Sequence, residues 1–149
     1  MIVSEICQGN PVTIGAHEEL DTAARLMRQY HIGYLIVVEP YYVAPRPVGV
    51  LTDRDIVVSV LAKGTDPRQV KVGEVMTREP VVVREDASLN SALAEMRRIG
   101  VRRLPVVNAA GHLTGVLSLD EVLDAVSQQL QGVVGSIRTE VRTEGARRP

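Results

Sequence analysis

The sequence predicts a mixed α/β (α+β) fold made of two copies of one β-α-β-β-α unit. An internal repeat is the first sign, because Pro11 recurs as Pro80 and Leu20 recurs as Leu89, each 69 residues later (80 − 11). Within each copy, apolar residues at helical spacing alternate with short valine-rich runs that glycine or proline bounds. A duplicated unit predicts two packed halves and a pair of related sites.

The first copy is predicted to run strand, helix, strand, strand, helix. Leu20, Ala23 and Met27 share one face of the first helix. The second helix stops at Lys63-Gly64, a basic last turn followed by a glycine C-cap. The later strands are short β-branched runs, which are typical of strands buried on at least one face. The predicted bounds are 12–14, 17–30, 34–38, 48–51 and 53–63.

The second copy repeats this order, with one change of offset. The offset falls to 66 (115 − 49) at Gly49 and Gly115, because the first copy carries three more residues before this point. That segment, 39–47, holds three prolines and is predicted to be a loop, since proline is excluded from paired strand interiors. The predicted bounds of the second copy are 81–83, 89–99, 104–108, 115–117 and 119–130.

These elements divide the chain into a first repeat at 1–66, a second repeat at 67–132 and a flexible C-terminal tail at 133–149. A repeat of roughly 70 residues is marginal alone, so the two halves are expected to pack sheet to sheet as one domain. The tail has charge but no sustained apolar period from Ser136 onward, which predicts disorder.

Composition excludes several classes of protein. The chain has 149 residues, is 45% apolar and has a net charge of −1, and its aromatic set is four tyrosines without tryptophan or phenylalanine. We therefore expect no nucleic-acid partner. No apolar run reaches the ~18 residues of a membrane span, and no signal peptide precedes the domain, so a cytoplasmic protein without a membrane partner is expected. The single cysteine, Cys7, has no internal disulfide partner.

The repeated motifs resemble those of a known family. The β-α-β-β-α unit, the stretch from Gly100 to Val107, and the two stretches Gly49–Asp55 and Gly115–Glu121 are similar to a tandem pair of cystathionine-β-synthase (CBS) domains, also called a Bateman module. The resemblance covers about Val3 to Leu130. It implies a non-catalytic regulatory module that binds adenosine-containing ligands in clefts between the repeats and commonly assembles as a disc-shaped dimer.

The candidate ribose site lies at the acidic N-terminal ends of the predicted helices 53–63 and 119–130. Asp55 can accept hydrogen bonds from ribose hydroxyls, and the Thr52 hydroxyl with free helix amides can hold phosphate oxygens. The alternative is a capping box, in which the hydroxyl and the acid satisfy backbone amides at the helix start. Ser118 and Glu121 fit that alternative better, because Glu121 is one methylene longer than the aspartate of the family pattern.

Basic residues supply the candidate phosphate site. Arg102 and Arg103 begin a strand where family members often carry phosphate-binding cations, and Arg54 can contact phosphate as well. The equivalents of the two arginines in the first repeat are Gly33 and Tyr34. A solvated surface is the alternative for these arginines. Two further residues complete the candidate ligand contacts, Thr13 and His31, and for His31 a structural role is the alternative.

The leading hypothesis is a sensor of AMP, ADP or ATP that acts in trans on an unknown regulated protein. The alternatives are a ligand-independent protein-protein interaction module with vestigial clefts and, less favoured, an unrecognised α/β enzyme. We predict no enzyme activity, catalytic residue, cofactor or metal site, because no nucleophile motif is present and the three histidines lack partners at ligand spacing. A homodimer is expected through helix residues, namely Leu20, Ala24, Met27, Ile56, Val60, Leu89, Leu93, Met96, Val122 and Val126.

Overall fold

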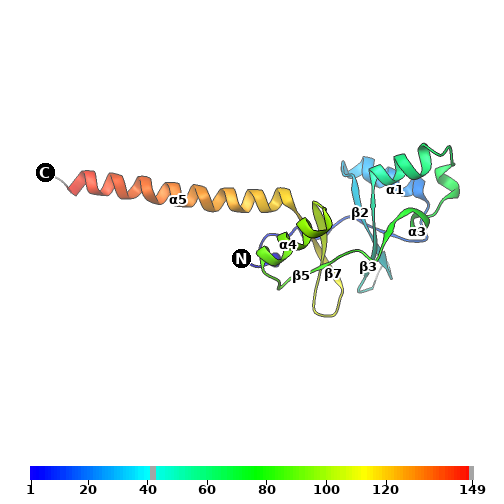
Figure 1. Ribbon diagram of the computed structural model, residues 1–149, viewed down its shortest axis with the longest axis horizontal. Coiled ribbons are helices and arrows are strands. Elements are labelled where there is room, and N and C mark those ends of the chain that lie inside the picture. The colour runs from blue at the N-terminus through cyan, green and yellow to red at the C-terminus, as the bar shows by residue number, and fades with distance from the viewer. Residues whose placement is uncertain (41–42, 148–149) are drawn as a thin grey trace.

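The computed structural model describes residues 1–40 and 43–147. Two βαββ-type halves lie side by side, and a long helix projects from one of them (Figure 1). In chain order the elements are η1 (Val3–Glu5), β1 (Thr13–Gly15), α1 (Leu20–Tyr30), β2 (Tyr34–Glu39), β3 (Arg46–Thr52), α2 (Asp53–Ile56), η2 (Val57–Leu61), η3 (Pro67–Gln69), α3 (Val72–Val75), β4 (Thr77–Arg78), β5 (Val83–Arg84), α4 (Leu89–Ile99), β6 (Arg103–Val107), β7 (Leu113–Ser118) and α5 (Leu119–Arg147).

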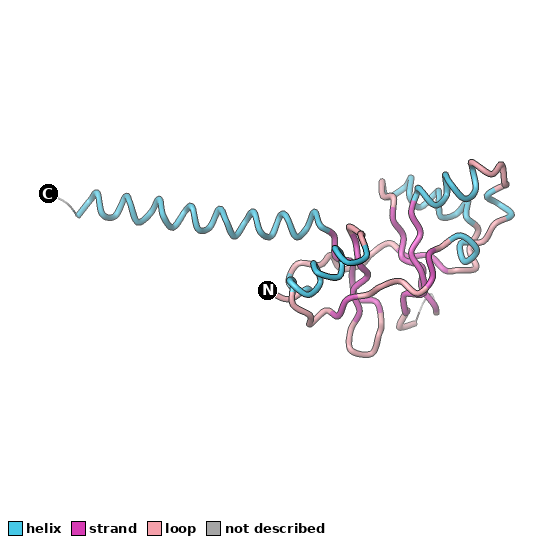
Figure 2. Tube along the Cα trace, in the orientation of Figure 1, coloured by secondary structure: helices cyan, strands magenta, loops and turns pink. Residues whose placement is uncertain are grey.

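The predicted order of elements is confirmed in both repeats. The strands form two sheets, of order β1-β2-β3-β4 and β5-β6-β7, in which the first strand of each repeat runs parallel to the second and the second runs antiparallel to the third. The strands occupy the middle of the body, with α1 on one outer side and α4 on the other (Figure 2). This arrangement is the expected packing of sheet to sheet.

Each repeat has its own apolar core. The first cluster surrounds Leu20, Leu35 and Leu51, and the second surrounds Leu104 and Leu117. The intervening residues of β2, such as Ile36 and Val38, are buried as well although they lie outside the first cluster, so both faces of this strand are covered. Burial on both faces explains why β2 reads as a continuous apolar run.

The two cores exchange their flanking segments. The N-terminal segment joins the second repeat, where Val3 is fully buried and Gln8 pairs with Val116. The segment before the second repeat joins the first, where Val72 lies in the core and Thr77 pairs with Val50. Each core thus includes residues from the sequence range of the other repeat, because short flanking segments carry no periodic signal that assigns them to a core.

The proline-rich segment at 39–47 differs in part from the predicted loop. Pro47 lies within β3, opposite Val38, at a register shift between Val37 and Val38. A bulge of this kind relaxes the ladder and tolerates a residue without an N–H. The rest of the prediction includes Tyr41 and Tyr42, which lie outside the described residues.

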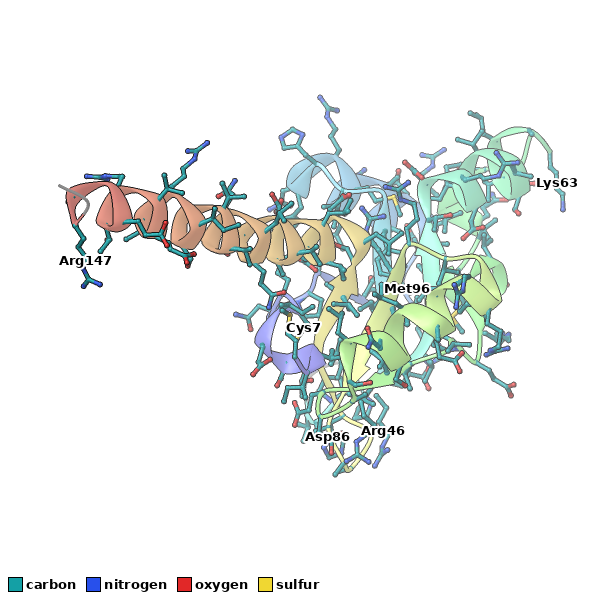
Figure 3. The ribbon with its side chains drawn as sticks, turned by 60° about the vertical axis from the view of Figure 1, so that its left-hand side comes forward. Cys7, Arg46, Lys63, Asp86, Met96 and Arg147 are labelled. Atoms are coloured by element: carbon teal, nitrogen blue, oxygen red, sulfur yellow. The ribbon has the colours of Figure 1, made fainter. Side chains whose placement is uncertain are left out.

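The predicted flexible tail is wrong for most of its length. α5 continues without a break through 133–147, and Arg147 marks its far end in Figure 3. Val133, Ile137 and Val141 follow one another at intervals of four residues, which continues the apolar side of the helix. No proline occurs between Pro105 and Pro149, so no residue of this type breaks the helix before its end.

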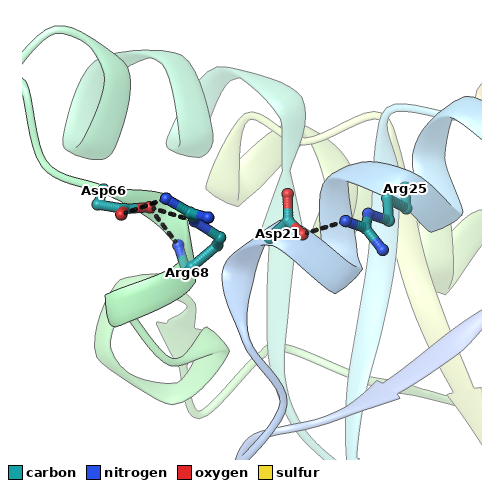
Figure 4. A network of polar contacts seen from close by, with 4 residues as sticks. All are labelled: Asp21, Arg25, Asp66 and Arg68. Atoms are coloured by element: carbon teal, nitrogen blue, oxygen red, sulfur yellow. Dashed lines mark hydrogen bonds and ion pairs between the residues drawn. The ribbon is translucent and has the colours of Figure 1, made fainter.

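Exposed ion pairs lie near the segment that follows η2. Asp66 accepts hydrogen bonds from the backbone and guanidinium of Arg68, and Asp21 pairs with Arg25 on α1 at 2.9 Å (Figure 4). The hydrogen bonds from Arg68 lower the pKa of Asp66. Exposed pairs of this kind contribute little to folding, so apolar burial and strand pairing hold the repeats together.

Exchange of flanking segments requires glycine in the strand that each segment meets. A Cβ at Gly115 would lie 2.7 Å from the carbonyl oxygen of Gln8, which is backbone and cannot move aside easily. We expect Gly115→Ala to destabilise the protein by about 1–3 kcal/mol in urea denaturation. The control is Gly132→Ala, whose Cβ would meet no atom within 4 Å and which should stabilise slightly. Equal stability of the two variants would contradict the proposed contact.

Candidate functional site

An open cleft of about 740 Å³ lies where the start of α2 meets the segment between α4 and β6. The first repeat supplies the residues around Thr52, and the second repeat supplies Gly100 to Pro105. Five predicted ligand contacts line this first cleft together: Thr52, Arg54, Asp55, Arg102 and Arg103. Residues 47 to 51 positions apart in the sequence (102 − 55 and 103 − 52) thus converge because the halves pack around a pseudo-twofold axis.

A capping box fixes the acidic end of the first cleft. The backbone N–H of Thr52 donates to Oδ2 of Asp55 at 2.9 Å, and the backbone N–H of Asp55 donates to Oγ1 of Thr52 at 3.2 Å. Asp55 is half-buried, so its carboxylate is held at the cleft wall. Ligand contact and helix capping are therefore compatible roles, because the box engages one carboxylate oxygen.

The first-turn amides of α2, which were expected to be free for phosphate, have hydrogen-bond partners within the protein. The amide of Asp53 donates to the carbonyl oxygen of Gly33 at 3.0 Å, and the amide of Arg54 donates to Oδ1 of Asp53 at 2.8 Å. The amide of Asp55 donates to Thr52, as described above. The first turn thus satisfies its own donors, and guanidinium groups are the cations left to meet an anion.

The basic end of the first cleft is exposed. Arg102 lies 3.6 Å from the carboxylate of Asp120, a pair in which both side chains are about three-quarters exposed. The guanidinium of Arg103 lies over the ring of Tyr34, 5.7 Å from its centroid. A cation-π contact of this kind holds a guanidinium in place without neutralising its charge.

A second, smaller cleft of about 330 Å³ repeats this geometry in the other half. Val116 and Ser118 occupy the positions of Val50 and Thr52 in the first cleft, since each is 66 residues later. Ser118 lines this cleft, whereas Glu121 does not and instead accepts a hydrogen bond from the Ser118 amide at 2.9 Å. The capping role predicted for Ser118 and Glu121 is confirmed.

Tyr34 and Arg103 border both clefts, and sequence reasoning missed the role of Tyr34. The Tyr34 hydroxyl is buried and has no hydrogen-bond partner among the described residues. Burial raises the pKa of this hydroxyl, and the charge of Arg103 offsets that rise only in part. The offset of 69 residues aligns Tyr34 with Arg103. This equivalence could have predicted that both residues belong to the wall between the clefts.

Three predicted contacts fall outside both clefts, and Glu121, described above, is one of them. Thr13 begins β1, where it pairs with Ile36, and is not among the lining residues. His31 caps the C-terminus of α1 in the left-handed conformation, with φ of 54°, and is exposed. The structural role is therefore the better interpretation of His31, since its backbone ends the helix.

Histidine and acidic side chains also meet outside the two clefts. A concavity near Gly15 includes His17 and Glu39, whose side chains lie 3.9 Å apart. Across residues 1–40 and 43–147, no group of three or more His, Cys, Asp or Glu side chains could hold a metal ion. We also find no helix in these residues, the 29-residue α5 included, with the length and hydropathy of a membrane span.

The fold is that of two tandem α/β repeats with a cleft on each side of their contact. A family model identifies both repeats. The model of the CBS domain matches residues 3–62 and 72–128. The chain belongs to the CBS domain family and is a CBS pair, as the motifs predicted.

Relatives support this assignment over most of the chain. The CBS domain-containing protein YhcV of Bacillus subtilis is 35% identical over 129 residues, which are 87% of this chain and 86% of that protein. An uncharacterized protein of Methanopyrus kandleri, MK0525, is 31% identical over 121 residues, 81% of this chain, and the chain spans 60% of its length.

Solved structures share the architecture. The crystal structure of Hypoxic Response Protein I with two coordinated zinc ions matches with a TM-score of 0.74 and 32% identity, covering 83% of this chain and 98% of that one. The crystal structure of CBSX2 in complex with AMP matches with a TM-score of 0.72 and 28% identity. The match covers 85% of this chain and 96% of that one. CBSX2 comes from Arabidopsis thaliana. A CBS pair of this architecture can therefore bind an adenine nucleotide.

The buried hydroxyl of Tyr34 predicts an alkaline loss of stability. The folded protein keeps this proton at pH values where the unfolded chain, with a tyrosine pKa of about 10, loses it. Stability is then fully present below about pH 10 and falls as the pH rises further. We expect Tyr34→Phe to lose less stability than the parent protein between neutral and strongly alkaline pH in chemical denaturation. Identical pH profiles would show that Tyr34 ionises as freely in the folded state.

Proposed function

We propose that this CBS pair is a non-catalytic regulatory module that binds an adenine nucleotide of the AMP, ADP or ATP class in the first cleft. One observation carries the proposal: a half-buried carboxylate, Asp55, and the guanidinium groups of Arg54, Arg102 and Arg103 line the same cleft of about 740 Å³. A carboxylate suits ribose hydroxyls and a guanidinium suits phosphate, so the two ends match the two polar parts of a nucleotide.

The wall between these ends suits the adenine ring. It includes the apolar side chains of Val50, Val81, Ile99 and Val101. Burial of a flat apolar ring between such side chains is favourable, and polar groups at the cleft ends then fix its orientation. The AMP complex of the related CBSX2 supports the same ligand class.

The second cleft supports the alternative of a vestigial site. Among the described residues that line it there is one cation, Arg103, which it shares with the first cleft, and Glu121 is held by its helix cap and does not line it. We assign the nucleotide to the first cleft alone. If the first cleft is vestigial too, the chain is a ligand-independent interaction module. Nucleotide titrations distinguish this module from a nucleotide sensor.

A regulatory module without its own catalytic site acts on a partner in trans. Assembly as a homodimer belongs to the same proposal, with a different surface from the one expected. Six expected interface residues are buried in their own chain: Leu20, Met27, Val60, Leu89, Met96 and Val122. Val126 of the expected set is exposed, as are Val57, Val58, Leu61 and Leu123, and we assign the dimer contact to these five residues.

The acidic end is tested by a matched pair of amide substitutions. Asp55→Asn and Glu121→Gln each preserve an oxygen for the capping box but remove the carboxylate charge. We expect Asp55→Asn to weaken AMP binding about tenfold or more, because a charge-assisted hydrogen bond contributes about 1.5–3 kcal/mol. Glu121→Gln should leave AMP affinity unchanged in isothermal titration calorimetry. Equal effects of the two substitutions would place the ligand elsewhere.

The basic end is tested by the choice between AMP and adenosine. We expect AMP to bind more tightly than adenosine, and the double variant Arg102→Ala with Arg103→Ala to lose most of this preference and its salt dependence. Adenosine affinity should be nearly unchanged in the same calorimetric series. The assignment of the phosphate end is wrong if adenosine binds the parent protein as well as AMP does.

A further inference from the structure

The repeat brings two unlike residues together at the boundary of the clefts. Tyr34 begins β2 and pairs with Thr52, and Arg103 begins β6 and pairs with Ser118. Both Tyr34 and Arg103 line both clefts, and the guanidinium carbon of Arg103 lies over the Tyr34 ring, 5.7 Å from its centroid. The two side chains therefore meet where the repeats meet, and strand pairing fixes the backbone beneath each of them.

The ring of Tyr34 is the contact that can hold this guanidinium. Among the residues that the structure describes, Arg103 has no ion-pair partner, whereas Arg102 lies 3.6 Å from Asp120. Arg103 is exposed, so without the ring its long side chain would sample many rotamers in water. A cation-π contact restricts the guanidinium but leaves its positive charge without a counter-charge. The charge of Arg103 therefore stays available to an anion.

Contact with the ring and contact with a phosphate are compatible. A guanidinium is planar, and it stacks on aromatic rings through its face while it donates hydrogen bonds from its edge. The two contacts thus use different parts of one group. A donor that is held in place before the ligand arrives loses less conformational entropy on binding. The ring of Tyr34 is therefore expected to favour phosphate binding by Arg103 and not to compete with it.

The difference between the two repeats at this position has a physical reason. An arginine in place of Tyr34 would bring two guanidinium groups to one boundary, where like charges repel. With a tyrosine in the first repeat and an arginine in the second, the pair is attractive. The first cleft gains a restrained cation, and the described residues of the second cleft include that same cation and no other.

The ring of Tyr34 is the part of the side chain that acts on Arg103. The hydroxyl oxygen is buried and has no hydrogen-bond partner among the described residues. A ligand in either cleft therefore does not reach it while the side chain keeps this position. Phenylalanine retains the ring without the hydroxyl, whereas leucine is apolar but has no π-electrons. These two replacements separate the roles of ring and hydroxyl.

We propose that Tyr34 is a positioning residue for the phosphate end of the first cleft, because its ring holds the Arg103 guanidinium where that group meets the ligand phosphate. This inference rests on the nucleotide site proposed above. It adds that part of the preference for AMP over adenosine comes from a residue that carries no charge and does not touch the phosphate.

Calorimetric titrations with AMP and adenosine test the role of the ring. The readout is the ratio of the two dissociation constants, which cancels any general change in the cleft. We expect Tyr34→Leu to lower the AMP preference about threefold or more, which corresponds to one cation-π contact, and Tyr34→Phe to retain it. Tyr30→Leu is the matched control, since Tyr30 lines the second cleft but not the first.

A double-mutant cycle tests whether Tyr34 acts through Arg103. In an Arg103→Ala background, Tyr34→Leu should change the AMP preference no further, because a positioning residue has no effect once the group that it positions is absent. If Tyr34→Leu does not fold, Tyr34→Ile takes its place in every comparison, since a β-branched side chain suits a strand.

NMR of the nucleotide-free protein tests the contact itself. The Nε–Hε signal of Arg103 is assigned by its loss in Arg103→Lys. We expect the ring current of Tyr34 to shift this signal away from those of the other exposed arginines. The shift should persist in Tyr34→Phe and disappear in Tyr34→Leu.

The outcomes distinguish this inference from the nucleotide site. An unchanged AMP preference in Tyr34→Leu, with a loss in Arg103→Ala, would overturn the positioning role and leave the nucleotide site intact. A loss in Tyr34→Phe equal to that in Tyr34→Leu, or a further loss in the Arg103→Ala background, would also overturn it. If the parent protein binds adenosine as well as AMP, the phosphate end of the proposed site fails and this inference fails with it.

Discussion

The structure depends on the exchange of flanking segments between two repeats. Gln8, which precedes β1 of the first repeat, pairs with a strand of the second, and Thr77, which precedes β5 of the second repeat, pairs with a strand of the first. Gly49 and Gly115 make these approaches possible, since a side chain at either would strike the arriving segment. The same segments continue into the cleft walls, because residues 79–81 line the first cleft and 10–12 line the second. The pairing that joins the halves therefore also builds the clefts.

The two repeats share one backbone fold but differ in the side chains that line the clefts. Arg103 in the second repeat and Tyr34 in the first occupy equivalent positions, and their side chains stack at the wall between the clefts. The first cleft has several cations beside a half-buried aspartate. The described residues that line the second include Ser118 and the shared Tyr34 and Arg103 but not Glu121, which is engaged in its helix cap. Specificity for a charged ligand thus comes from a few side chains and not from the backbone, which both halves share.

The sequence predicts the repeat well because periodic apolar positions report on cores. α4 has its predicted bounds of 89–99, and the five residues of the first cleft follow from motif positions. The exchanged segments were missed because β4 has two residues and no period. The first-turn amides of α2 were predicted to be free because capping by Asp53 and the carbonyl of Gly33 depends on tertiary geometry. The outer part of α5 was predicted to be disordered because Ile137 and Val141 are the large apolar residues from Ser136 onward, which is too few for a sustained apolar period.

The central claim is that a nucleotide occupies the first cleft, and a titration of the ¹⁵N-labelled protein with AMP followed by NMR tests it most directly. The account predicts the largest amide shifts at Arg54, Asp55 and Arg103, with small shifts at Gln8 and Ser118. Shifts centred on Gln8 and Ser118, or no shifts at millimolar AMP, would contradict it.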